Sequence, residues 1–108
     1  IHYNYYMSNF LSTNKIDTIF HLAAKARVQP SIEDPVKFNK TNVDGILNLL
    51  KGAVDNGVKN FIFSSSSSVY GNVEVFPTDE THSTDPMSPY GAQKLFGNGK
   101  ICSTKIEW

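Results

Sequence analysis

The fold is decided near the start of the chain by a short β-rich run, Ile16-Asp17-Thr18-Ile19-Phe20-His21-Leu22, which ends in the small residues Ala23 and Ala24. A second such run, Phe61-Ile62-Phe63, ends in a series of serines. Short, nearly continuous apolar runs are typical of strands that are buried on both faces of a parallel sheet. Helical patterns flank both runs, so we expect a βαβ unit of a doubly wound α/β fold.

The clearest helical pattern of the chain lies between the two strands. Asp34 can cap this helix with Pro35 in its first turn, and Asn56-Gly57 tolerates the left-handed conformation that ends a helix. The apolar residues recur every three or four positions and so form one stripe. The stripe comprises Val43, Ile46, Leu47, Leu50 and Val54.

Two further helices are expected, one before the first strand and one near the end of the chain. The later one begins at Ser88-Pro89 and runs to about Ser103, and residues 71–87, rich in proline and acidic residues, form a loop before it. The earlier helix should gather four apolar side chains on one side. These are Tyr6, Met7, Phe10 and Leu11.

Composition excludes several classes of protein. The 108 residues carry ten basic and ten acidic side chains, so zero net charge gives no electrostatic reason to expect a nucleic acid or an anionic membrane as partner. A single cysteine, Cys102, cannot form an internal disulfide or a thiolate zinc cluster, which favours a reducing compartment and thus the cytoplasm. No apolar run approaches the roughly 20 residues that span a bilayer.

The strand inventory is too small for a complete sheet of this class. Only two strands can be found, whereas such sheets usually hold about five or six. Two parallel strands alone leave bare edges and a poorly enclosed core. We therefore expect residues 1–108 to be the middle part of a larger protein.

Chemistry is expected where parallel strands end, because open α/β sheets bind ligands beyond the carboxyl ends of their strands. Tyr90 and Lys94 are four residues apart, hence on one helical face, where an ammonium lowers the pKa of a phenol toward that of a general acid/base. A hydroxyl from the run Ser64 to Ser68 would share the substrate oxygen. Alternatively, the pair packs on an exposed helix and the serines form a linker or caps. The position of the run, directly after a buried strand, favours a site.

Five segments, in this order and spacing, resemble the extended short-chain dehydrogenase/reductase family, in its NAD-dependent nucleotide-sugar epimerase and dehydratase branch. They are Phe20-His21-Leu22-Ala23-Ala24, Thr41-Asn42-Val43-Asp44-Gly45, Val58-Lys59-Asn60-Phe61-Ile62-Phe63-Ser64-Ser65-Ser66, Val69-Tyr70-Gly71 and Ser88-Pro89-Tyr90-Gly91-Ala92-Gln93-Lys94. The resemblance implies a partial Rossmann-type NAD(P)-binding domain that contains the middle βαβ portion and the catalytic helix.

The resemblance also implies roles for single residues. Tyr90 matches the acid/base, Lys94 the lysine that binds the nicotinamide ribose and tunes that tyrosine, and Ser66 the hydroxyl that holds the reacting sugar oxygen. Ser64 matches a residue against the nicotinamide ribose. A lone histidine such as His21 is interpreted as a core residue rather than a catalytic one.

Other matched positions concern the cofactor. The loop after the first strand matches the segment that passes the adenosine-side ribose and pyrophosphate, where small side chains allow a close backbone approach. Its residues are Leu22, Ala23, Ala24, Lys25 and Ala26. Thr41 and Asn42 match a polar pair that supports the cofactor from the crossover helix. No metal is expected.

The implied reaction is NAD-dependent epimerisation of a nucleotide-activated sugar through transient oxidation at C4, as in UDP-hexose 4-epimerases. Related dehydratases carry an Asp-Glu pair after the serine or threonine. Ser67 and Ser68 stand at those positions and cannot do that acid/base work, which favours an epimerase. A dehydratase, a reductase or a decarboxylating relative of the same family stays open, as does a truncated, non-catalytic binding or assembly module.

The family's glycine-rich turn and its C-terminal substrate domain are not found in the sequence. We therefore expect the 108 residues to bind NAD poorly and to catalyse nothing alone, and the choice of NAD over NADP rests on the branch. The implied partners are a nucleotide sugar, in the first place a UDP-sugar, and a second copy. The homodimer contact would use the helices at 35–56 and 88–104.

Overall fold

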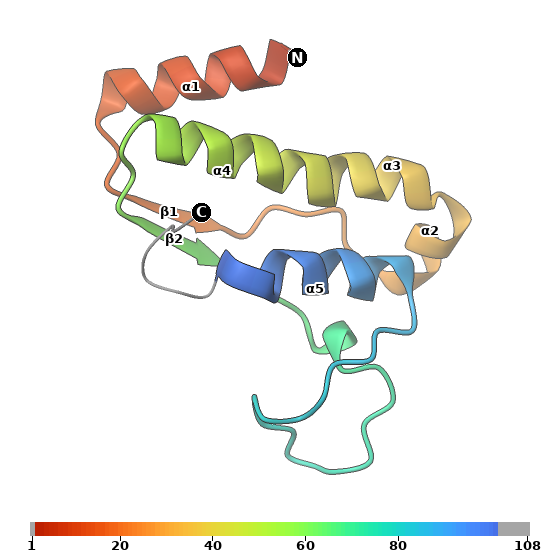
Figure 1. Cartoon of the computed structure of the whole chain (residues 1–108). Coiled ribbons are helices and arrows are strands. Elements are labelled where there is room, and N and C mark those ends of the chain that lie inside the picture. Colours follow the sequence, from red (N-terminus) through yellow and green to blue (C-terminus); the bar gives the residue numbers. More distant parts are fainter. Residues whose placement is uncertain (1, 102–108) are drawn as a thin grey trace.

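The computed structural model describes residues 2–101, which form an α/β arrangement (Figure 1). The α-helices are α1 (His2–Asn14), α2 (Val28–Glu33), α3 (Pro35–Asn39), α4 (Gly45–Asp55) and α5 (Pro89–Ile101). The strands are β1 (Thr18–His21) and β2 (Asn60–Phe63), the π-helical turn η1 spans Lys40–Asp44, and the 3₁₀ turn η2 spans Ser67–Val69.

The two strands pair in parallel, as the sequence predicted. Ile19 lies opposite Phe61 and His21 opposite Phe63. The connection between them runs through α2, α3, η1 and α4, so the βαβ unit and the α/β fold class are confirmed.

The crossover helix starts and ends where its sequence signals predicted. The Asp34 carboxylate accepts a hydrogen bond of 3.0 Å from the Lys37 N–H, which supplies one of the N–H groups of the first turn with a partner. Pro35 is the first helical residue, and Gly57 adopts a φ of 68° just beyond the C-terminus. The π-helical stretch in its middle was not predicted.

The buried stripe of this helix is displaced from the predicted one. Val43 and Val54 are half-buried, and Leu47 is 40% exposed. Ile46 and Leu50 are buried as predicted, and Leu49 and Ala53, which the prediction missed, complete the inner face. Tertiary packing decides the inner face, because the buried residues of α4 are those that cluster with Leu11 of α1 and with Phe61 and Phe63 of β2.

Helix α1 was predicted correctly, but only half of its expected apolar side points inward. Leu11 is buried and Met7 packs against the core. Tyr6 and Phe10 are 73% and 56% exposed. The prediction failed here because α1 packs against α4, and the four side chains span an arc of the helix that is wider than this contact.

The last helix and the loop before it match the sequence prediction. The Ser88 hydroxyl accepts a 3.0 Å hydrogen bond from the Gly91 N–H at the start of α5. The expected end near Ser103 lies outside the described residues. The short helix α2 was not predicted, since its six residues include Pro30 and show no repeating apolar pattern.

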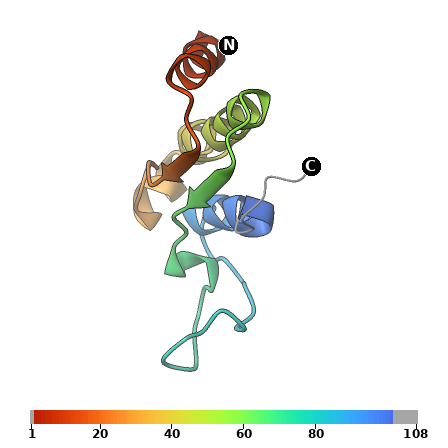
Figure 2. The ribbon, with the colours of Figure 1, turned by 90° about the vertical axis from the view of Figure 1, so that its left-hand side faces the viewer.

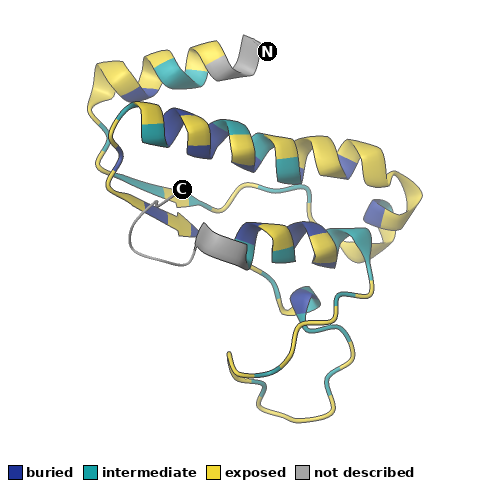
Figure 3. Cartoon of the chain, viewed as in Figure 1, coloured by how far each residue is buried: buried dark blue, intermediate teal, exposed yellow. Residues whose placement is uncertain are grey.

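Helices α4 and α5 lie on the same side of the two-stranded sheet (Figure 2). Phe61 and Phe63 of β2 are buried against helices α4 and α5. Figure 3 shows buried positions on α4 and on the adjoining part of α5. On the opposite face, Phe20 and Ile62 are 68% and 44% exposed.

Candidate active site

The lysine predicted to be catalytic joins α5 to the end of β2. Lys94 is only 5% exposed, and its Nζ donates a 2.9 Å hydrogen bond to the carbonyl oxygen of Ser64. Its Nζ also lies 4.8 Å from the centre of the Phe63 ring, within range of a cation–π contact. Burial lowers the pKa of Lys94 below its ordinary value. A buried ammonium therefore sits directly beyond the strand, where the parallel sheet would bind a ligand.

Tyr90 occupies the first turn of α5, one turn before Lys94. The two side chains thus share one face of the helix, as their spacing predicted. The Tyr90 backbone N–H donates a 3.1 Å hydrogen bond to the hydroxyl of Ser31 in α2. That hydroxyl in turn donates 2.6 Å to the Val28 carbonyl, and Ser31 is fully buried. The start of α5 is therefore fixed by a side chain 59 residues upstream.

The serine run turns sharply after β2 and packs under the start of α5. Ser66 is the N-cap of η2, and its hydroxyl accepts 3.2 Å from the Ser68 N–H. A Cβ added at Gly91 would lie 2.6 Å from the carbonyl oxygen of Ser68. Only glycine allows α5 to approach η2 this closely, and this approach brings the Tyr90 turn to the Ser66 turn.

The loop after β1 is held by one buried asparagine. The Lys25 N–H donates 2.8 Å to Asn42 Oδ1, and Asn42 Nδ2 donates 2.9 Å back to the Lys25 carbonyl. Arg27, at the end of the loop, has a φ of 85°. Leu22, Ala23 and Ala26 are exposed, while Ala24 is half-buried. The loop after β1 is therefore accessible to solvent on one side, and on the other side it is hydrogen-bonded to Asn42 of η1.

Of the two polar residues predicted to support the cofactor, only Asn42 reaches this loop. Thr41 is exposed, and its hydroxyl donates 3.4 Å to the Lys37 carbonyl of its own helix. Neighbouring residues on a helix point about 100° apart, so both cannot face the same loop.

Two further polar residues near the site were missed by the sequence reasoning. Gln93 accepts a 3.0 Å hydrogen bond at Oε1 from Asn42 Nδ2, and its own Nε2 donates 3.5 Å to the Pro35 carbonyl. Ser31 is the other. The apolar pattern of α5 gives no signal for Gln93, because its buried neighbours Lys94 and Gly97 are not apolar side chains. No feature of the sequence distinguishes Ser31.

His21 packs as an aromatic ring, in agreement with its interpretation as a core residue. It is stacked on Phe63 at an interplanar angle of 22° and tilted against Phe61, with both ring centroids 5.9 Å away. Burial, and next the positive charge of Lys94, lower the pKa of His21 from 6.5. The neutral imidazole is thus favoured beside the buried ammonium.

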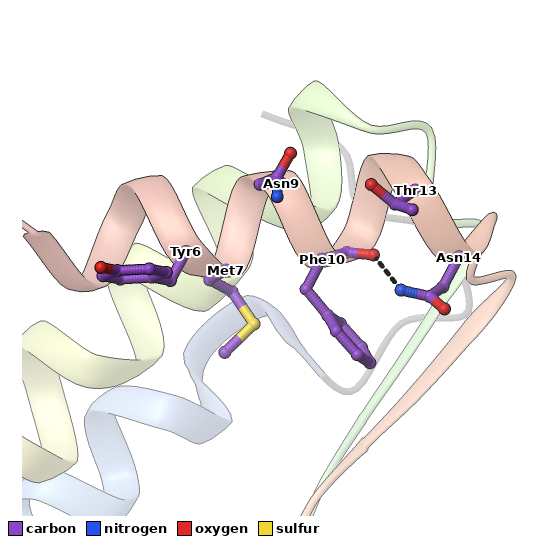
Figure 4. Close-up of a pocket in the computed structure, with 6 residues that line it drawn as sticks. All are labelled: Tyr6, Met7, Asn9, Phe10, Thr13 and Asn14. Carbon is purple, nitrogen blue, oxygen red and sulfur yellow. Dashed lines mark hydrogen bonds between the residues drawn. The ribbon is translucent and has the colours of Figure 1, made fainter.

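Two surface hollows lie on the described part of the chain, and the second includes Pro89, directly before Tyr90. One follows α1 and is lined by six of its residues (Figure 4). The other lies between α5 and the α3–η1 segment, where Val36 and Ala92 are among its lining residues. Neither hollow is lined by Tyr90, Lys94 or Ser66. Within residues 2–101, no helix is long and apolar enough to cross a membrane, and no three His, Cys, Asp or Glu side chains gather as metal ligands.

Comparison with known proteins places the chain among nucleotide-sugar enzymes. The family model described as GDP-mannose 4,6 dehydratase matches residues 4–103. The UDP-glucose 4-epimerase of Rhizobium leguminosarum bv. trifolii is 41% identical over 88 residues, which cover 82% of this chain and 27% of that protein.

Solved structures of similar enzymes share the fold of this chain. The UDP-glucose 4-epimerase of Stenotrophomonas maltophila, with bound NAD and formylated UDP-arabinopyranose, has a TM-score of 0.84 and 37% identity, over 88% of this chain and 28% of that one. The Brucella ovis UDP-glucose 4-epimerase in complex with NAD has a TM-score of 0.85 and 33% identity, over 88% and 29%. The chain therefore spans less than a third of the length of these proteins.

Proposed function

We propose that the whole protein epimerises a nucleotide-activated sugar at C4 with NAD as cofactor. The chain belongs to the nucleotide-sugar epimerase and dehydratase family of extended short-chain dehydrogenases/reductases, and this membership is the starting point of the proposal. A UDP-hexose is the proposed substrate, as the names of the similar enzymes suggest.

One observation carries the proposal: the buried ammonium of Lys94 lies 2.9 Å from the carbonyl at the end of β2, one helical turn from Tyr90. A lysine is rarely buried without a partner, because removing its charge from water is costly. Its place between the strand end and the phenol-bearing turn suits the tuning of an acid/base better than it suits packing alone.

The loop after β1 fits a dinucleotide. Ala23 and Ala26 are small and exposed, so the backbone can approach a ribose or a phosphate closely. Asn42 holds the same loop from behind through the Lys25 backbone. When bound, NAD supplies the reversible two-electron oxidation that the reaction needs.

The chain's own residues then move and hold the proton. Tyr90 takes the proton of the sugar C4 hydroxyl and later returns it, and the Lys94 ammonium lies one helical turn away on the same face of α5. The Ser66 hydroxyl donates a hydrogen bond to the same oxygen while it is a ketone. After the keto-sugar has rotated in the site, reduction of its opposite face gives the C4 epimer.

An epimerase is preferred to a dehydratase, the second candidate. The matching family model is named for a dehydratase, but the positions after Ser66 hold Ser67 and Ser68 instead of an acidic pair. Hydroxyl groups do not act as acid and base for water loss at neutral pH. A dehydratase would release a 4-keto-6-deoxy sugar, which an epimerase does not.

The test is turnover by the whole protein supplied with NAD and UDP-hexoses. We expect interconversion of C4 epimers, loss of nearly all turnover in Tyr90→Phe, and retained NAD binding in that variant. Tyr6→Phe, the same change on exposed α1, is the matched control and should keep full activity. Full activity of Tyr90→Phe would refute the role of the phenol.

The 108 residues alone are proposed to bind NAD weakly and to lack turnover, because none of their seven glycines forms a phosphate-binding turn. Isothermal titration that shows tight NAD binding would overturn this. The whole protein is proposed to act in the cytoplasm as a homodimer through the segments 35–56 and 88–104. The 78% exposure of Val36 on α3 supports the contact, and light scattering tests it.

A further inference from the structure

A buried polar network connects the loop after β1 to α5. Asn42 is 3% exposed and Gln93 is 6% exposed. The Asn42 amide makes three hydrogen bonds, two to the Lys25 backbone and one of 3.0 Å to Gln93 Oε1. Gln93 in turn contacts the Pro35 carbonyl at 3.5 Å. A single side chain therefore links three elements that are distant in sequence.

The chemistry of the amide explains why asparagine stands at this position. It offers an acceptor and two N–H donors in one plane. The acceptor and one donor pair with the N–H and C=O of Lys25, as a neighbouring β-strand would. The remaining donor is left for Gln93. Aspartate lacks both donors and leucine lacks all three groups, so neither can make this set of bonds.

The backbone is shaped to bring Asn42 inside. Phe38, Asn42 and Ile46 are all buried and follow each other at intervals of four. In a regular α-helix, the eight steps from Phe38 to Ile46 would shift the side-chain direction by about 80° around the axis. The wider π turn at Lys40–Asp44 reduces this drift and keeps Asn42 on the inner face. Such π turns occur frequently at functional sites.

The partner Gln93 directly precedes Lys94 and follows Tyr90 by three residues. We infer that Gln93 is a positioning residue, which, through Asn42, couples the proposed cofactor loop to the helix that carries Tyr90 and Lys94. This inference rests on the proposed function for its meaning, because it concerns the relative placement of the loop and the acid/base helix. The coupling itself is a property of the chain without any ligand.

The test measures hydrogen exchange of the Lys25 amide in the full chain by NMR. Gln93→Met removes the link to Asn42 but leaves both bonds from Asn42 to Lys25 in place. We expect it to accelerate Lys25 exchange by roughly fivefold or more, the effect of one lost buried hydrogen bond, relative to the amides of β2. Asn42→Leu should give a larger acceleration. Gln29→Met, the same change on the exposed face of α2, should leave Lys25 exchange unaltered.

The double variant Asn42→Leu/Gln93→Met separates coupling from two independent packing effects. If Gln93 acts through Asn42, the Lys25 amide exchanges no faster in the double variant than in Asn42→Leu alone. If the double variant instead accelerates Lys25 exchange by the product of the two single effects, the two residues act independently and the inference is overturned. It is also overturned by an unprotected Lys25 amide in the unmutated chain, an unaltered Lys25 in Gln93→Met, or a parallel acceleration at Lys25 and all of β2. Turnover by the whole protein decides the proposed function separately.

Discussion

The contact between α5 and η2 predicts opposite effects for the same substitution at two glycines. In Gly91→Ala, the new methyl carbon would lie 2.6 Å from the Ser68 carbonyl oxygen and 3.1 Å from Pro86 Cβ. An ordinary carbon–oxygen contact needs about 3.3 Å. The two elements must therefore separate by roughly 0.7 Å, because a backbone carbonyl cannot rotate away as a side chain can.

The control, Gly45→Ala, makes the same change at the first residue of α4, where no atom lies within 4 Å of the added Cβ. Replacing a helical glycine by alanine stabilises by about 0.5–1 kcal/mol at an unobstructed position. Overpacking at Gly91 costs about 1–3 kcal/mol. Gly91 is also helical and has the same gain, so we expect the free energy of unfolding of Gly91→Ala to lie about 1–3 kcal/mol below that of Gly45→Ala.

Urea denaturation of the two variants and the unmutated chain measures these free energies, with the slope m checked for constancy. In the whole protein, Gly91→Ala should also lower kcat by at least about tenfold, since a misplacement of 1 Å costs about a hundredfold. Equal stabilities of the two variants, within about 0.5 kcal/mol, would refute the reasoning, because the close approach of α5 to η2 would then not be required.

Two predictions concern pH. The lowered pKa of His21 means that the unfolded chain binds its proton at higher pH, so stability falls as pH decreases from 6.5 toward the lowered value. Thermal unfolding between pH 5 and 7 should show this fall, and His21→Phe should weaken it. Burial lowers the pKa of Lys94 from 10.5, so stability rises with pH between the lowered value and 10.5. Denaturation midpoints in that range should lose this rise in Lys94→Met, and an unchanged slope would contradict the assignment.

Local signals in the sequence predicted where most helices and strands lie, but not which face of each helix is buried. Asp34, Gly57 and Ser88 mark helix ends through bonds to residues at most a few positions away, so the sequence alone shows them. The inner face of α4 depends instead on packing against Leu11, Phe61 and Phe63, which are distant in the sequence. For the same reason, the prediction missed Leu49 and overrated Leu47.

The sequence suggests the proposed reacting groups of the candidate site, but it does not reveal the polar residues that hold their helix in place. Tyr90 and Lys94 are joined by helical spacing, which the sequence displays directly. Ser31 and Gln93 are polar residues, which are mostly exposed in proteins, and their burial is possible only because they find partners 51 to 59 residues away in the chain. Such pairs follow from the packing of helices rather than from any local pattern.

The polar contacts behind α5 have a consequence that apolar packing would not give. Apolar packing restrains a helix through the shapes of its side chains, because the hydrophobic effect itself has no direction. The hydrogen bonds from the Tyr90 N–H to Ser31 and from Asn42 to Gln93 each demand one orientation. Fixing α5 at two points along its axis sets its rotation as well as its position. Under the proposed function, α5 has to present the Tyr90 phenol and the Lys94 ammonium to bound ligands in one orientation, and two directional hydrogen bonds behind the helix suit that requirement.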